Sequence, residues 1–352
     1  MSKLLYIQIL RACAALAIAI HHAQFDAGAI AARLGGPFQP LDRIPWAAGV
    51  DVFFVISGFI IVYSSQTLFG SPGAGRVFLM RRLGRVVPLY WTVTSLYLAV
   101  ALVLPGVLNS EILEPGFILA SYLFIPLGRP DGAVQPLYSL GWTLNYEMYF
   151  YVLFALTLAW PKRTSIGMLI GVLLAATVVG SVVSLPQPLD FWTGPIILEF
   201  AFGVALAHLK SQGLVLPRGV RAAFAIGGLG LLLAGANLSM PRPVAYGVPA
   251  ALFVAAAALG ADRVRPETWL VRMGNALGDA SYALYLVHPF VIRAGREVVL
   301  RTGLGAVIGP WGYVALVLAG AVLASLMIFR WYERPMTEWL RRRSEPGRLK
   351  LA

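Results

Sequence analysis

The chain has 352 residues, of which 59% are hydrophobic and only 12% are Asp, Glu, Lys or Arg. This balance, with a mean hydropathy of +0.75, excludes a soluble globular domain, because too little polar surface remains to face water. The formal net charge of +12 does not indicate nucleic acid as a partner, because the basic residues gather at the ends of apolar runs. We therefore expect an all-α, polytopic membrane protein that contacts lipid.

About ten apolar segments approach the roughly 20 residues that a helix needs to cross a bilayer. They are expected near residues 5–25, 45–66, 86–104, 138–160, 165–185, 190–209, 220–238, 244–261, 277–298 and 311–332. Segment 116–128 is too short to cross, and we expect it at the interface or as a re-entrant segment. Residues 1–340 are predicted to form one transmembrane domain, followed by a basic cytoplasmic tail at 341–352 and by no soluble catalytic domain.

The distribution of Lys and Arg predicts that both termini are cytoplasmic. The basic residues expected on the cytoplasmic side are Arg76, Arg81, Arg82, Arg85, Lys162, Arg163, Lys210, Arg218, Arg221, Arg263, Arg265, Arg272, Arg341, Arg342 and Arg343. The opposite loops contain Arg33, Arg43, Arg129, Arg242 and the group from Arg293 to Arg301. An even number of spans agrees with this orientation.

The first span, which contains RACAALAIAIHHA, carries charge inside the membrane. Arg11 and His22 are eleven residues apart, close to three helical turns, so they share a face and lie about 16 Å apart along the axis. His21 is rotated away from this line. An Arg at the centre of a span costs roughly 2.5–3.5 kcal/mol on insertion scales, which favours a function for this stripe. A snorkelling Arg11 and a packing histidine explain the same pattern.

The next two segments place ionisable groups at opposite ends of the membrane. Asp51 opens the second span, GVDVFFVISGFII, near the expected height of His22, where a carboxylate would orient the imidazole. Helix capping is the alternative explanation. Arg82 and Arg85 are i, i+3 neighbours in the basic loop RVFLMRRLGRVVPLYW, where they would bind phosphates. A topogenic signal that contacts lipid headgroups is the alternative for this pair.

The fourth span, SLGWTLNYEMYFYVLF, contains Glu147 near mid-bilayer. An ionised carboxylate at that depth must be paired or protonated, and Arg11 is a candidate partner. Thr143, Glu147 and Tyr151 follow the i, i+4, i+8 spacing of one helical stripe, and Asn145 and Tyr149 lie with Trp142 on a neighbouring stripe of the same helix. A purely structural pair is the alternative reading of Glu147.

The ninth span, SYALYLVHPFVI, also carries polar side chains on one face. Ser281, Tyr285 and His288 follow the i, i+4, i+7 spacing of a helix. Pro289 follows His288 and favours a kink, which frees a backbone carbonyl.

Five segments in this order resemble the membrane acyltransferase-3 family of bacterial polytopic O-acyltransferases. They are the R-x10-H pattern of Arg11 and His22, GVDVFFVISGF, RRLGRVVPLYW, WTLNYEMYFYVLF and SYALYLVHP. Thr143 and Asn145 stand where many members have Ser, and WTLNYEM is more similar to the exopolysaccharide branch, which includes succinoglycan O-acetylation. The resemblance spans nearly the whole chain.

The resemblance implies an enzyme of the bacterial cytoplasmic (inner) membrane that uses acetyl-CoA as acyl donor. The acceptor would be a sugar hydroxyl of an exopolysaccharide or of a lipid-linked oligosaccharide precursor. Arg11, Arg82 and Arg85 would contact the coenzyme, with its thioester arm running along the polar stripe.

The same resemblance implies roles for the remaining polar residues. His22 would act as general base or become acylated, Asp51 would orient it, and Glu147 would shape the polar interior. A hydrogen bond to the thioester oxyanion would come from Tyr149 or Tyr285. The other substrate-site candidates are Asn145 and His288.

Alternatives remain open at the level of the sequence. Polar stripes across several spans also fit a transporter or flippase for a saccharide or a lipid-linked intermediate, although no paired halves with matching broken helices are seen. Other acceptors, a succinyl or longer acyl group, and direct or acyl-histidine transfer use the same residues. No ligand spacing suggests a metal site.

Overall fold

The computed structural model describes residues 4–104, 113–235, 238, 240–261 and 268–344. Arg263, Arg265 and residues 345–352 of the expected basic tail lie outside the described residues, as do residues 236–237 at the end of an expected span. Regular structure in the described part is helical, with an isolated β-bridge between Gly128 and Val134. The predicted all-α class is therefore confirmed for these residues.

The chain divides into two compact units, which are described separately. The first unit comprises residues 1–56 and 209–332, and the second comprises residues 57–208 and 333–352. The helix α2 (Gly49–Ser64) contributes its first half to the first unit and its second half to the second. Two helices also end across this division, because residue 333 at the end of η5 belongs to the second unit and residues 209–211 at the end of α8 belong to the first.

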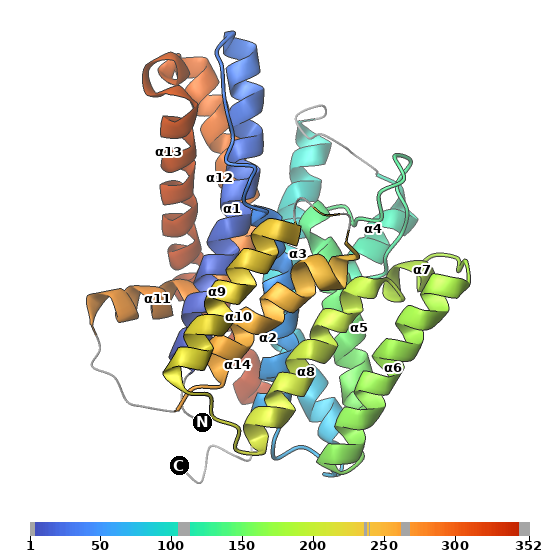
Figure 1. The fold of residues 1–352 in the computed structure, drawn as a ribbon. Helices are drawn as coiled ribbons and strands as arrows, with labels where there is room; N and C mark the ends of the chain where they lie inside the picture. The colour runs from blue at the N-terminus through green and yellow to red at the C-terminus, as the bar shows by residue number, and fades with distance from the viewer. Residues whose placement is uncertain (1–3, 105–112, 236–237, 239, 262–267, 345–352) are drawn as a thin grey trace. The chain divides into compact units, whose positions relative to one another are not determined.

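The first unit is built around the long helix α1, which α11, α12 and α13 contact. In Figure 1, α12 and α13 run beside α1, while α11 crosses it. The further elements of this unit are η1, α9, η4, α10 and η5. The bounds are α1 Leu5–Leu34, η1 Trp46–Ala48, α9 Arg218–Gly235, η4 Pro243–Gly247, α10 Val248–Ala258, α11 Trp269–Asp279, α12 Ser281–Thr302, α13 Leu304–Ile328 and η5 Phe329–Glu333.

Helix α1 extends nine residues beyond the expected span 5–25 and ends where Gly35 adopts a left-handed conformation, with φ of 67°. Glycine has no Cβ and adopts this conformation without strain. The added turns pack against α12 and α13 through a buried apolar cluster. Its members are Ala23, Ala27, Ile30, Ile292, Val299, Tyr313, Val314 and Val317.

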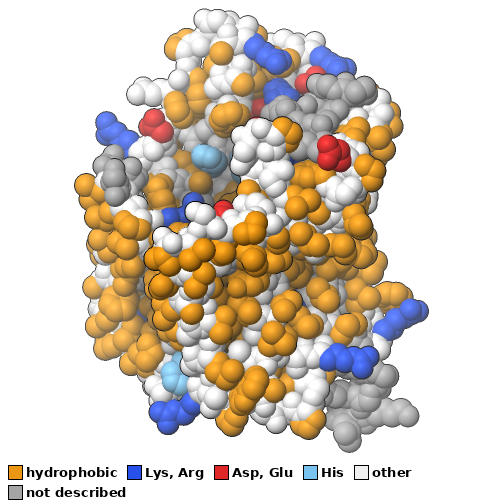
Figure 2. Space-filling model, turned by 90° about the vertical axis from the view of Figure 1, so that its right-hand side faces the viewer, with side chains coloured by type: hydrophobic (Ala, Val, Ile, Leu, Met, Phe, Trp, Pro, Cys, Tyr) orange, Lys and Arg blue, Asp and Glu red, His pale blue; other side chains and the backbone are white. Residues whose placement is uncertain are grey.

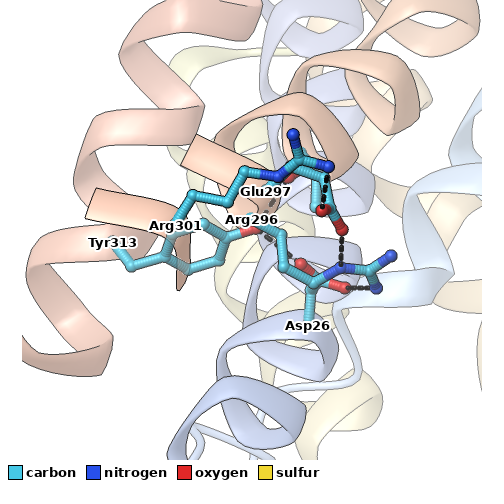
Figure 3. A network of polar contacts seen from close by, with 6 residues as sticks. Asp26, Arg296, Glu297, Arg301 and Tyr313 are labelled. Carbon is cyan, nitrogen blue, oxygen red and sulfur yellow. Dashed lines mark hydrogen bonds and ion pairs between the residues drawn. The ribbon is translucent and has the colours of Figure 1, made fainter. Parts of the chain in front are cut away.

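A network of ion pairs lies beside this cluster (Figure 3). Arg296 Nη1 donates to Asp26 Oδ1 at 2.9 Å, and the Tyr313 hydroxyl donates to Asp26 Oδ2 at 2.6 Å. Glu297 extends the network, with its oxygens 3.8 Å from Arg296 Nε and 3.6 Å from Arg301 Nη2. Asp26 therefore has a partner for each carboxylate oxygen, which makes its burial tolerable.

The second unit is a set of helices held by aromatic packing. Its elements, in addition to the second half of α2, are α3 Ala74–Val103, α4 Pro115–Tyr122, η2 Ser139–Gly141, α5 Trp142–Thr157, α6 Lys162–Val182, α7 Leu189–Trp192, η3 Pro195–Ile197, α8 Leu198–Ser211 and α14 Arg334–Ser344. Phe154 packs against Phe78 with ring centroids 4.8 Å apart, and Phe150 stacks on Phe200 at 4.5 Å. A Cβ on Gly58 would lie 2.2 Å from the Phe200 carbonyl oxygen, so only glycine allows α2 and α8 to approach this closely.

Seven helical runs among the described residues are long and apolar enough to cross a bilayer, which indicates a multi-pass membrane protein. They are Leu5–Leu34, Trp46–Ser64, Ala74–Val103, Lys162–Val182, Leu189–Ser211, Arg218–Gly235 and Leu304–Arg343. Figure 2 shows a face on which hydrophobic side chains predominate and charged side chains are sparse. The other expected spans, near 138–160, 244–261 and 277–298, are helical but shorter or less apolar, so the number ten and the orientation stay predictions.

One expectation about local structure was wrong. The basic segment RVFLMRRLGRVVPLYW was expected to be a loop before a span starting at residue 86, but it is helical and forms the first half of α3. Arg, Leu and Met are strong helix formers, so the helix continues beyond the apolar stretch that marks the membrane.

Candidate functional site

His22 on α1 contacts His288 on α12 in the first unit. Nδ1 of His22 lies 2.9 Å from Nε2 of His288, and the two rings stack with centroids 5.1 Å apart and planes 25° apart. His288 is fully buried, whereas His22 is half-buried. The two histidines predicted as site residues from separate spans therefore form one pair.

Hydrogen bonding assigns the protons in this pair. Nδ1 of His288 lies 2.9 Å from the Leu284 carbonyl oxygen, which only accepts, so this nitrogen carries a proton. In a neutral His288, Nε2 is then an acceptor, and Nδ1 of His22 must donate to it. Neutral His22 therefore carries its unprotonated nitrogen at Nε2. An imidazole fixed in this tautomer is ready to accept a proton or to act as a nucleophile.

The surroundings of the pair explain how the rings are held. Ser281, Tyr285 and His288, for which the helical spacing predicted a shared face, are all buried. The Tyr285 ring centroid lies 6.4 Å from that of His288 and 6.4 Å from that of Phe53 on α2. His21 is exposed, in agreement with its predicted rotation away from His22.

Asp51 has a different hydrogen-bond partner from the predicted one. Its side chain is fully buried, and Oδ2 accepts from Arg242 Nη2 at 3.0 Å, while Nδ1 of His22 contacts His288 instead. A buried carboxylate is best compensated by a full positive charge, which a neutral imidazole does not supply. The sequence had placed Asp51 at the outer end of the second span and Arg242 in an outer loop, but it had not paired them.

Arg11 lies nearer the N-terminus of α1 than His22 does, and it belongs to a chain of hydrogen bonds that reaches α11. Arg11 Nη1 donates to Gln8 Oε1 at 3.2 Å, and Gln8 Nε2 donates to Asp279 Oδ1 at 2.8 Å. The sequence had suggested Glu147 as the partner of Arg11, and it had not singled out Gln8 or Asp279. Gln8 gives little indication of a functional role in the sequence, because a neutral Gln at a helix end is common and has many roles.

Glu147 lies on α5 in the second unit. Its Oε1 accepts from the Ser57 hydroxyl at 2.9 Å and from the Tyr151 hydroxyl at 2.5 Å. Tyr151 is one turn further along α5, on the stripe that the i, i+4 spacing predicted. The Arg82 guanidinium of α3 interacts electrostatically with the Glu147 carboxylate. The carboxylate is therefore compensated by two hydroxyl donors and a nearby guanidinium.

Arg81, Arg82 and Arg85 of α3 line a pocket of about 350 Å³ in the second unit. Arg82 Nη2 donates to the Ser64 hydroxyl at 2.8 Å, and its guanidinium lies 5.6 Å from the centroid of the Phe78 ring. This volume is within the range of small-molecule sites, which starts near 300 Å³. The pocket brings together the two arginines predicted to bind phosphates, and a further wall comes from α14.

Asn145 is also buried on α5, with 1% of its surface exposed. Neither polar atom of its amide has a hydrogen-bond partner among the described residues. Tyr149, one turn along the helix, stacks on Trp192 with centroids 5.4 Å apart and planes 6° apart. Buried amides are normally satisfied, so Asn145 is well suited to bind a polar substrate group.

Among the described residues, no group of three His, Cys, Asp or Glu side chains lies close enough together to hold a metal ion. The sequence also gave no site role to Arg242 or to the α14 residues that line the pocket, which are Thr337, Leu340 and Arg341. For Arg242 a signal existed, because a buried Asp51 requires a cation at the same end of the helices.

Comparisons with known proteins agree on one family. The family described as an acyltransferase domain matches residues 4–330. The chain is 35% identical to the exopolysaccharide production protein ExoZ of Rhizobium meliloti, over 82% of this chain and 89% of the relative. It is 25% identical to the acyltransferase MdmB of Streptomyces mycarofaciens, over 84% of this chain and 81% of that relative. No solved structure matches the chain.

Proposed function

Because the chain belongs to the acyltransferase family, whose domain spans residues 4–330, we propose that it transfers an acetyl group from acetyl-CoA to a sugar hydroxyl. The acceptor is an exopolysaccharide or its lipid-linked precursor, and the protein works in the bacterial cytoplasmic membrane. The similarity to ExoZ, which is named for exopolysaccharide production, supports this acceptor class. The geometry that carries the proposal is the hydrogen-bonded chain from Leu284 through His288 to His22.

In the proposed reaction, Nε2 of His22 takes the proton of the acceptor hydroxyl. The hydroxyl oxygen forms a bond to the thioester carbonyl carbon, the carbon–sulfur bond breaks, and the CoA sulfur takes the proton back from the imidazolium. The products are an O-acetyl ester and free CoA thiol. The same nitrogen would serve an acyl-histidine route, in which His22 carries the acetyl group before the hydroxyl attacks.

In this proposal, the arginines bind the acyl donor and a tyrosine stabilises the oxyanion. Arg82 and Arg85 bind the phosphates of the donor, which need cationic partners, and Arg11 supplies a further positive charge. Tyr149 or Tyr285 donates a hydrogen bond to the thioester oxyanion.

Three further side chains have roles in the proposal. Asp51 is paired with Arg242 in the first unit, and Glu147 accepts hydrogen bonds from two hydroxyl groups in the second unit, so both carboxylates are compensated. Asn145 contacts the acceptor through its buried amide.

The test is deletion of the gene followed by NMR of the cell's polysaccharide. We expect the O-acetyl signal to vanish, and to return with the wild-type chain but not with His22→Gln. The same spectra identify the acyl group as acetyl rather than succinyl or a longer chain. An unchanged O-acetyl signal in the deletion strain would refute the proposed acceptor.

A further inference from the structure

One wall of the pocket that Arg81, Arg82 and Arg85 line, here called the basic pocket, is formed by α14, the last helix that the structure describes. Thr337, Leu340 and Arg341 line the pocket together with Arg82 and Arg85. From these residues we infer that α14 is part of the donor site, with Arg341 and Thr337 binding the phosphates of the CoA nucleotide. The inference rests on the proposed function, which assigns CoA to this pocket.

The sequence of α14 places these residues on one face. Thr337, Leu340 and Arg341 follow the i, i+3, i+4 spacing of neighbours on a helix. Leu340 packs against Gly84 of α3, where a Cβ would meet its side chain at 3.5 Å in ordinary van der Waals contact. This contact holds the Thr337–Arg341 face toward the α3 arginines.

Other charged residues of α14 have different neighbours. Arg334 Nε donates to Glu338 Oε1 at 2.9 Å on the exposed surface. The Arg343 guanidinium lies 4.0 Å from the centroid of the Trp339 ring. Arg341 therefore differs from the other arginines of the basic run by its position in the pocket wall, and a topogenic role alone does not require that position.

The charge of the pocket favours a polyanion. Four arginines line it, Arg81, Arg82, Arg85 and Arg341, and none of its described lining residues is Asp or Glu. Like charges gathered in one partly enclosed site repel one another, and an anionic ligand relieves that repulsion. The nucleotide end of CoA carries a pyrophosphate and a 3′-phosphate. The Thr337 hydroxyl is a suitable further donor to phosphate oxygen.

The matched comparison is Arg341→Ala against Arg342→Ala. Both remove one positive charge from adjacent positions of the same helix, but only Arg341 lines the pocket. We would measure the affinity of the full chain for CoA in nanodiscs of zwitterionic lipid. We expect Arg341→Ala to weaken binding by about 10-fold to 100-fold, as for the loss of a charged hydrogen bond, and Arg342→Ala to stay within about twofold of wild type.

Further arms separate the possible failures. If Arg85→Ala loses CoA binding while Arg341→Ala and Arg342→Ala both bind like wild type, α14 is not part of the site and the proposed donor site survives. If wild type does not bind CoA, the donor assignment itself fails. If Arg341 instead controls binding of anionic phospholipid, tested in nanodiscs with and without that lipid, the pocket holds a lipid headgroup and the inference is overturned.

Discussion

Two polar layers connect α1 with neighbouring helices of the first unit, one with α12 and the other with α12 and α13, and their hydrogen bonding differs. The imidazole layer consists of His22 and His288, and the ion-pair layer consists of Asp26, Arg296 and Tyr313. They are one helical turn apart on α1. In the ion-pair layer each carboxylate oxygen accepts from a protein donor. In the imidazole layer the chain of hydrogen bonds ends at Nε2 of His22, for which the described residues supply no donor.

This difference separates a stabilising group from a reactive one. A buried polar group whose bonds are all made within the protein contributes to folding and has nothing left to offer a substrate. An imidazole that is oriented by a hydrogen bond at one nitrogen and receives no hydrogen bond from the protein at the other nitrogen is available for proton transfer. Substitutions in the two layers should therefore act on different observables.

The largest effect is expected for His22→Gln. The glutamine amide still donates to Nε2 of His288, but it has no basic nitrogen, so transfer of radiolabelled acetyl into polysaccharide should fall about 10²–10⁴-fold. The unfolding midpoint in detergent should stay near that of wild type. A variant that retains full transfer activity would show that Nε2 is not the base.

Asp26→Ala should act on stability instead. Removing Asp26 breaks the 2.9 Å ion pair and leaves Arg296 with the longer, 3.8 Å contact to Glu297, which costs about 3 kcal/mol of unfolding free energy. Transfer activity per folded molecule should remain near the wild-type value. The control is Asp26→Leu combined with Arg296→Met, which removes both charges and should recover most of the stability. A stable Asp26→Ala protein without activity would place Asp26 in the reactive site.

His288→Ala should give a smaller effect than His22→Gln. It removes the acceptor that fixes the His22 tautomer, a hydrogen bond of about 1 kcal/mol, so kcat should fall by up to about tenfold with KM for acetyl-CoA unchanged. His288→Gln offers a carbonyl oxygen near the same position and should restore most of the rate. Equal kcat values for His288→Ala and His288→Gln would show that His288 contributes packing and does not fix the His22 tautomer.

The same comparison shows what the sequence predicts and what it misses. The i, i+11 spacing of Arg11 and His22 and the i, i+7 spacing of Ser281 and His288 follow from helical geometry, so the faces of these helices were predictable. The C-terminal end of α1 was not predictable. The expected span ended at residue 25, just before the charge of Asp26. The partner of Asp26, Arg296, is 270 residues away, and one sequence contains no signal of that contact.

The partners of site residues show the same difference between local spacing, which is predictable, and contacts between distant parts of the sequence, which are not. Glu147 and Tyr151 share a stripe by local spacing, whereas Asp51 and Arg242 are 191 residues apart. The α14 wall of the pocket was hidden because Arg341 belongs to a run of three arginines that also serves as a topology signal.

The most direct test of the central claim is nitrogen-15 NMR of protein labelled at histidine. The chain has four histidines, and the His22 signal can be identified by its loss in His22→Gln. We predict a neutral His22 ring with its proton on Nδ1 and an unprotonated Nε2. A proton on Nε2 with Nδ1 bare would contradict the hydrogen-bonded chain through His288, and with it the assignment of His22 as the base.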